Sequence, residues 1–271
     1  MAALFEPAGL PAQSPSIALL IDADNVSHSK IAPILSELAK YGTANVRRAY
    51  GDWTGTSLKG WKAKLHEFAI RPVQQFSYSA GKNASDMALV IDAMELLYTK
   101  RPAAFCLVSS DADFTPLVMH LRDAGCAVFG FGERKTPDPF VNACTTFLFL
   151  DSLAETVAEA APAADAAVRV EQPVRAPARA AKPGKLAQDA RLVEILRNAV
   201  EASMRDDGWA VLAAAGSSAK RVSSIDPRNY GCKNFPALFE ATGLFDIVRP
   251  AGTQPLISDK RNLDRAKTPQ P

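Results

Sequence analysis

The first long apolar run of the chain reads Ile17-Ala18-Leu19-Leu20-Ile21 and leads directly into Asp22-Ala23-Asp24-Asn25. Such an unbroken apolar run is typical of a strand that is buried on both faces. An aspartate at its end would lie at the carboxyl edge of a sheet, where open α/β sheets bind their ligands. The stretch therefore predicts a parallel sheet with an acidic group at its functional edge.

Apolar runs and helical patterns alternate through the first half of the chain. The expected strands are residues 17–22, 46–50, 72–77, 105–110, 127–132 and 147–150, and the expected helices are residues 30–41, 58–70, 85–98 and 114–124. This order is typical of βαβ units, which build a mostly parallel sheet flanked by helices. The predicted fold class is α/β.

Three aspartates from separate loops, Asp22, Asp86 and Asp111, would meet at the carboxyl edge of this sheet. Crowded carboxylates raise each other's pKa unless a cation lies between them. Mg²⁺ or Mn²⁺ is the expected cofactor, because both ions prefer oxygen ligands. Each Asp alone also fits a helix cap or first turn, but the three together favour a metal site. Asn25 offers an amide that can orient a water or a carboxylate.

Two classes of enzyme use a metal bound by carboxylates at a sheet edge. A nuclease uses the ion to bind the scissile phosphate and to activate water. A haloacid-dehalogenase-type phosphohydrolase uses the first Asp of a D-x-D-x-[TV] pattern as its nucleophile, and residues 22–26 match that pattern. That class also needs a later Ser or Thr, then a Lys, then an acidic pair. No suitable Lys separates Ser109 from Asp111, so the phosphohydrolase remains the minority interpretation.

Length and composition set further limits. The chain has 271 residues, of which 48% are hydrophobic, and its formal net charge is +2. This is enough for one large core and a smaller module, without an overall basic field. The N-terminus does not resemble a secretory signal, and no apolar run reaches the length of a membrane span. We expect a cytoplasmic protein with no membrane partner. The cysteines are expected to be reduced and structural: Cys106, Cys126, Cys144 and Cys232.

The composition changes twice along the chain, and these changes predict the domain boundaries. Ala, Pro, Arg and Lys dominate residues 154–188, which is typical of a flexible linker. Apolar residues at helical spacing return after this segment. The expected parts are a disordered lead at residues 1–15, an α/β domain at 16–153, the linker at 154–188, a small domain at 189–256 and a disordered tail at 257–271.

With these motifs in order, residues 17–151 resemble the NYN domain, a branch of the PIN-like nucleases. The resemblance is carried by residues 21–25, by Lys82-Asn83-Ala84-Ser85-Asp86 and by Ser109-Ser110-Asp111-Ala112-Asp113-Phe114. It implies a PIN-like, Rossmann-like fold in which Asp22, Asp86 and Asp111 bind the divalent metal. It also implies that Asp113 completes the acidic pocket and that Asn25 supports the first loop. The family often has Gly before the third-motif Asp, where this chain has Ser110.

The small domain resembles an OST-HTH, or LOTUS, module, a winged-helix-like fold associated with RNA. The resemblance is carried by Asp207-Gly208-Trp209-Ala210 and by Asn229-Tyr230-Gly231-Cys232-Lys233-Asn234-Phe235. Its RNA-facing candidates are Lys220, Arg221, Arg228, Tyr230 and Lys233. A protein-binding or purely structural domain is the alternative.

The first domain also contains candidate RNA contacts. Lys82 precedes Asp86 and could neutralise a phosphate, and Arg47 and Arg48 could follow an RNA backbone beside Trp53 and Trp61. The tryptophans fit a core position at least as well.

Together these features predict a metal-dependent endoribonuclease with a tethered RNA-binding module, because a tether raises the local concentration of a polymeric substrate. RNA is the expected partner, and the exposed apolar side of a small sheet could also pair in a homodimer. The alternatives are an RNA-binding adaptor that cuts nothing and, less favoured, the phosphohydrolase.

Overall fold

The computed structural model describes residues 14–76, 84–153, 186–250 and 253–266. These residues form two compact units, which are described separately. Nearly all of the expected lead at residues 1–15 and of the expected linker at 154–188 lies outside the described residues. Among the described residues, no helix combines the length and the apolar character needed to cross a bilayer.

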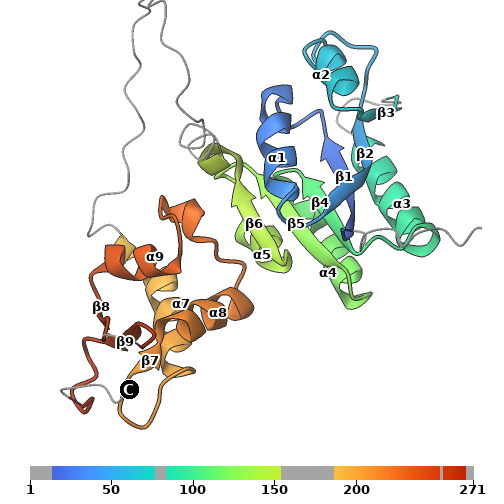
Figure 1. The fold of residues 1–271 in the computed structure, drawn as a ribbon. Helices are drawn as coiled ribbons and strands as arrows, with labels where there is room; N and C mark the ends of the chain where they lie inside the picture. Colours follow the sequence, from blue (N-terminus) through green and yellow to red (C-terminus); the bar gives the residue numbers. More distant parts are fainter. Residues whose placement is uncertain (1–13, 77–83, 154–185, 251–252, 267–271) are drawn as a thin grey trace, which may run out of the picture. The chain divides into compact units, whose positions relative to one another are not determined.

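The N-terminal unit is built on a six-stranded sheet with strand order β3-β2-β1-β4-β5-β6 (Figure 1). Its strands are β1 (Ser16–Asp22), β2 (Thr43–Gly51), β3 (Arg71–Gln74), β4 (Ala104–Val108), β5 (Ala127–Gly132) and β6 (Thr146–Phe149). β1 pairs in parallel with β2 and β4, and the pairs β2–β3 and β4–β5 are also parallel. The predicted α/β class with a mostly parallel sheet is therefore confirmed.

The strand order changes direction between β1 and β4. From β1 the chain adds β2 and β3 on one side, and it then returns to add β4, β5 and β6 on the other. In open α/β sheets the crevice at such a switch point is where ligands bind. The side chains of Ile17–Ile21 on β1 have no exposed surface, so one of the two strands at the switch point is fully buried.

Helices connect the strands as the sequence pattern predicts. They are α1 (Ile31–Leu38), α2 (Trp61–Glu67), α3 (Ala84–Thr99), α4 (Thr115–Asp123) and α5 (Asp138–Ala143). The four expected helices are found with shifted ends. The sequence pattern missed α5, because its six residues are too few to establish a helical period and include Pro139.

The C-terminal unit combines helices with a small antiparallel sheet of order β7-β9-β8 (Figure 1). Its elements are α7 (Ala190–Glu201), β7 (Ala210–Val211), α8 (Leu212–Val222), α9 (Phe235–Thr242), β8 (Phe245–Val248) and β9 (Leu256–Asp259). Leu196, Leu238 and Phe239 are fully buried in its core. A few helices with a small sheet fit the predicted winged-helix-like class.

The expected boundaries of this small domain were too narrow at both ends. Leu186, which was assigned to the linker, is buried in the core of the unit. The predicted disordered tail from residue 257 is wrong for its first part, because β9 continues to Asp259 and Ile257 has no exposed surface. The indole Nε1 of Trp209 also donates to the carbonyl of Ala266 at 2.9 Å. The polar composition of this segment concealed its role, since backbone pairing leaves little trace in composition.

Candidate active site

The carboxyl ends of β1 and β4 bring the first and third acidic motifs together. Ile21 pairs in register with Val108, the last residue of β4. Asp22 and the loop from Ser109 to Asp111 therefore leave the sheet side by side, at its switch point. This is the arrangement that the sequence predicted for the functional edge.

Asp22 is buried, with 1% of its surface exposed. Its Oδ2 accepts hydrogen bonds from the Asn25 amide and from the Ser109 hydroxyl, each at 2.9 Å. Its Oδ1 is also buried but has no hydrogen-bond partner among the described residues. Burial raises the pKa of Asp22, whereas the hydrogen bonds from Asn25 and Ser109 lower it. A buried carboxylate oxygen without a partner is costly, and a bound cation would remove that cost.

Asp86 lies in the first turn of α3 and faces the other acids. Its pKa is raised to about 6, first by burial and then by repulsion from the carboxylates of Asp22, Asp111, Asp24 and Asp113. The sheet thus brings all three acidic motifs within electrostatic range of one another. Mutual repulsion of this kind is what a divalent cation relieves.

The carboxylates do not form a closed cage. In the part of the chain that the structure describes, no group of three or more His, Cys, Asp or Glu side chains is arranged to hold a metal ion. An open, oxygen-only donor set fits Mg²⁺ or Mn²⁺ better than a tightly caged ion, since Mg²⁺ usually keeps several waters and takes one or two carboxylates. Carboxylate oxygens are the type of ligand that such an ion prefers.

Hydrogen bonds tie the loops of the acidic edge to one another. Asp111 caps a short 3-10 turn at residues 112–114, where its Oδ1 accepts from the backbone N–H of Asp113 at 2.9 Å. The cap and the acidic-site interpretations of Asp111 are thus compatible. The Ser85 hydroxyl donates to Asp24 Oδ2 at 2.7 Å and joins the first motif to the start of α3. Sequence reasoning missed the roles of Ser85 and Ser109, whose only signal was their position beside motif aspartates.

Several other candidates of the N-terminal unit lie in intramolecular contacts. The Arg47 guanidinium donates to the carbonyls of Ala44 and Phe68, at 2.9 and 2.8 Å. Arg48 pairs with Asp92 at 2.6 Å, and Asp92 is not among the carboxylates that raise the pKa of Asp86, which agrees with its helical spacing from Asp86. Contact of Arg47 or Arg48 with RNA stays a prediction.

The two aromatic candidates differ in burial: Trp61 belongs to the core, whereas Trp53 is half-buried. Trp61 is 2% exposed, which agrees with the core interpretation of its helical spacing. The Trp53 indole donates to the carbonyl of Val73 at 3.0 Å. Lys82 lies outside the described residues.

The RNA-facing candidates of the C-terminal unit differ in exposure. Lys220 and Arg221 are exposed in the last turn of α8, and Lys233 is exposed before α9. Arg228 is held by Asp226, which accepts from its Nε at 2.8 Å and from its Nη2 at 2.7 Å. Tyr230 packs against the core of the unit. The exposed lysines and Arg221 are thus the better placed candidates for a phosphate backbone.

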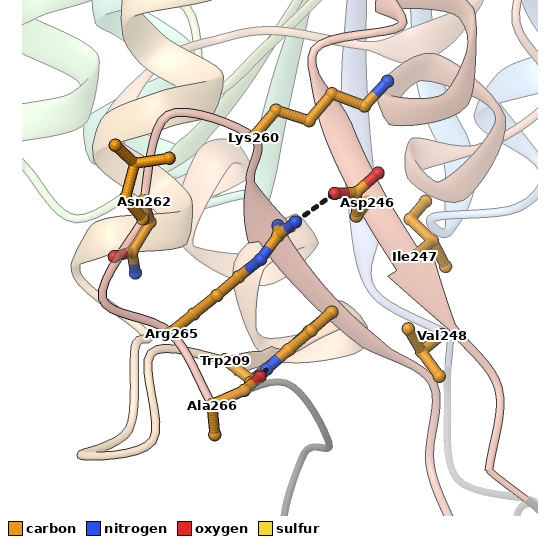
Figure 2. A pocket seen from close by; sticks show the side chains of 9 residues that line it. Trp209, Asp246, Ile247, Val248, Lys260, Asn262, Arg265 and Ala266 are labelled. Carbon is orange, nitrogen blue, oxygen red and sulfur yellow. Dashed lines mark hydrogen bonds and ion pairs between the residues drawn. The ribbon is translucent and has the colours of Figure 1, made fainter.

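A pocket of about 530 Å³ lies in the C-terminal unit, and no aspartate of the three motifs lines it. Figure 2 shows the Arg265 side chain running past Trp209 towards Asp246. Its guanidinium lies 5.2 Å from the centre of a Trp209 ring and pairs with the Asp246 carboxylate. Lys260 also lines the pocket and donates to the carbonyl of Gly243. Sequence reasoning missed this pocket because it placed residues 257–266 in a disordered tail.

The parallel sheet with acids at its switch point defines a PIN-like α/β domain of the nuclease type. The chain belongs to the NYN domain family, whose model matches residues 16–151. Residues 187–257 match the OST-HTH/LOTUS domain. Both predicted resemblances are thereby confirmed.

A solved structure also resembles the chain. It is the crystal structure of a protein of unknown function from Vibrio parahaemolyticus, with 17% sequence identity and a TM-score of 0.45. The match covers 54% of this chain and 98% of the other. Comparison with curated proteins found no match.

Proposed function

We propose that this protein is a metal-dependent endoribonuclease that hydrolyses RNA phosphodiesters. The observation that carries the proposal is the cluster of carboxylates from three separate loops at the switch point of an NYN domain, with one buried Asp22 oxygen lacking a partner. NYN domains belong to the PIN-like nucleases, which generally use divalent metals. In this proposal Asp22, Asp86 and Asp111 hold Mg²⁺ or Mn²⁺, and Asp113 completes the acidic pocket.

In this proposal each residue of the site has a distinct role. Asn25 and Ser109 fix Oδ2 of Asp22 and leave its Oδ1 as the ligand atom. Asp86 and Asp111 add negative charge from two other loops, and a bound ion would polarise the phosphate and lower the pKa of the attacking water. Ser85 holds Asp24 and thereby keeps the first loop next to α3. No side chain needs to become covalently modified.

The second domain would hold the substrate. The OST-HTH/LOTUS match suggests RNA binding, and Lys220, Arg221 and Lys233 are exposed cations on that unit. Because the net charge of the chain is only +2, binding would depend on such local clusters rather than on an overall field. We also propose that Lys82, Arg47 and Arg48 contact the RNA. A cytoplasmic location is a further part of the proposal.

The direct test is incubation of the full chain with end-labelled single-stranded RNA and Mg²⁺ or Mn²⁺, beside EDTA. Internal cuts that disappear in EDTA and in Asp111→Asn are expected. Asp123→Asn is the matched control, since Asp123 is an exposed aspartate at the end of α4. RNA binding without cutting under either metal would favour the adaptor. Phosphate release from small esters without RNA cleavage would favour the phosphohydrolase.

Removing residues 186–271 is expected to weaken RNA binding while slow cleavage remains, because the acidic edge lies wholly in the N-terminal unit. The loss of a tethered module typically costs at least about a hundredfold in affinity. Fluorescence anisotropy in an Asp111→Asn background measures binding without cutting. Unchanged affinity of the shortened chain would contradict a role of the second domain in RNA binding.

Neutralising exposed cations tests the same domain without shortening it. Lys220→Gln with Arg221→Gln is expected to weaken RNA binding and to reduce the slope of log affinity against log salt by about 0.7 for each lost phosphate contact. Exposed Arg249, which is already paired with Glu240 at 2.8 Å, provides a control as Arg249→Gln. A salt slope that is the same in both variants and in the wild type would argue against this surface.

A further inference from the structure

Helix α3 carries apolar side chains on both of its faces. Leu89, Ala93, Leu96 and Leu97 are buried, and the helix packs on β1 and β2. On the opposite face, Met87, Ile91 and Tyr98 are 59%, 61% and 63% exposed. A helix that is apolar all round is normally covered on all sides. Among the residues that the structure describes, none therefore covers the outer face of α3.

These exposed side chains and the half-buried Met94 form a stripe, defined here as Met87, Ile91, Met94 and Tyr98. At 100° per residue these four positions fall within an arc of about 60°. Residues 87–98 include no Lys or Arg. An RNA backbone or an anionic membrane surface would be recognised by such cations, so the stripe suits another apolar protein surface.

The stripe matches itself when it is reversed. In an antiparallel pair of α3 helices centred between Asp92 and Ala93, Met87 faces Tyr98 of the other copy and Ile91 faces Met94. A surface that is complementary to itself after a half-turn is what a two-fold dimer requires. The Met87–Tyr98 pairing also brings a thioether to an aromatic ring, which is a favourable contact.

The charges at the two ends of α3 support the same orientation. The helix begins at Ala84 and carries Asp86 in its first turn. It is followed by Lys100 and Arg101, which are both exposed. An antiparallel pair brings this basic end of one copy towards the acidic edge of the other, at distances where exposed charges still interact.

We propose that the chain forms a two-fold homodimer through antiparallel pairing of α3, with Lys100 and Arg101 of each copy beside the acidic edge of the other. The inference does not depend on nuclease activity, because it stands on the stripe and on the charges at its ends. The second copy would cover the apolar face and add cations next to the site that receives the RNA.

The first test is the mass of the full chain in solution, measured by light scattering during size-exclusion chromatography over a range of concentrations. The wild type is expected at twice the chain mass of 29.0 kDa, and Ile91→Glu at the mass of one chain. Val222→Glu is the matched control, since Val222 is 64% exposed on α8, outside the stripe, and this variant should remain a dimer. Circular dichroism checks that each variant is folded.

A wild type that is monomeric at every concentration would overturn the proposal, and so would a dimer that survives Ile91→Glu.

The second test addresses the register of the helices. A Met87→Cys variant is mixed with a Tyr98→Cys variant and treated with a short bismaleimide. The mixture is expected to give a cross-linked dimer, whereas each variant alone should give no more than the wild type, in which Cys126 and Cys232 are partly exposed. Equal cross-linking in the single-variant samples would overturn the antiparallel register.

Discussion

Asp22→Asn is expected to abolish RNA cleavage without unfolding the N-terminal domain. The substitution keeps the shape of the side chain, and its amide oxygen can still accept from Asn25 and Ser109. It removes the negative charge of the buried Oδ1, which is the atom best placed to bind the ion. A loss of at least about a thousandfold in rate, or about 4 kcal/mol of transition-state stabilisation, is the scale of a lost metal-ion contribution. Single-turnover cleavage of end-labelled RNA measures it.

The fold of the Asp22→Asn variant is expected to be as stable as the wild type when metal is removed. Burial disfavours the ionised form of Asp22 and raises its pKa. Removing this charge therefore removes the free-energy cost of keeping a carboxylate away from water in the folded state.

Asp92→Asn is the matched control in the same domain. Asp92 neutralises Arg48 and lies outside the acidic edge, so this variant is expected to lose stability but to retain cleavage per folded molecule. If Asp22→Asn cleaves as fast as the wild type, Asp22 does not bind the catalytic ion.

Asp86→Asn is expected to stabilise the metal-free protein at pH 8 and to have almost no effect near pH 4. The pKa of Asp86 is raised from 3.8 to about 6 in the folded state. A raised carboxyl pKa means that the folded state binds the proton more tightly than the unfolded state does. This tighter proton binding therefore stabilises the folded state fully at pH values below the unfolded pKa of Asp86. The stabilisation is lost as the pH rises through about 6.

The shift of the Asp86 pKa limits the size of the effect. It corresponds to at most about 3 kcal/mol, and solvent screening at this partly exposed group reduces that figure. Urea unfolding in EDTA, at several pH values between 4 and 8, gives the difference in free energy of unfolding between variant and wild type. A difference that does not change with pH would show that Asp86 is not crowded by the other carboxylates.

Adding Mg²⁺ or Mn²⁺ should reverse the order of stability of these two proteins. An ion that binds only the folded wild type stabilises it by about 2.7 kcal/mol at a hundredfold excess over its Kd. Asp86→Asn removes one ligand and should gain much less from the same ion. Thermal unfolding with and without metal compares the wild type with Asp86→Asn. An equal increase in stability of both proteins on adding metal would exclude Asp86 as a ligand.

Local patterns in the sequence were sufficient to predict most strands and helices of the N-terminal domain. The run before Asp22 predicts a buried strand, and β1 ends at that residue. The expected helix at residues 85–98 differs from α3 by one residue at each end. Strand and helix periods arise between neighbouring residues, so they can be read without a tertiary structure. The short helix α5 and strand β9 were missed because neither carries enough period or apolar character.

The sequence by itself predicted that Asp22 and Asp111 lie at the same edge of the sheet, because each ends or closely follows a strand and parallel strands end on one side. Only the tertiary structure decided how those acids are held. The Ser109 hydroxyl reaches Asp22 across 87 positions of sequence, and the Ser85 hydroxyl reaches Asp24 across 61. It also decided that no described segment covers the outer face of α3. A sequence pattern shows that a side chain is apolar, but contacts between distant segments decide what covers it.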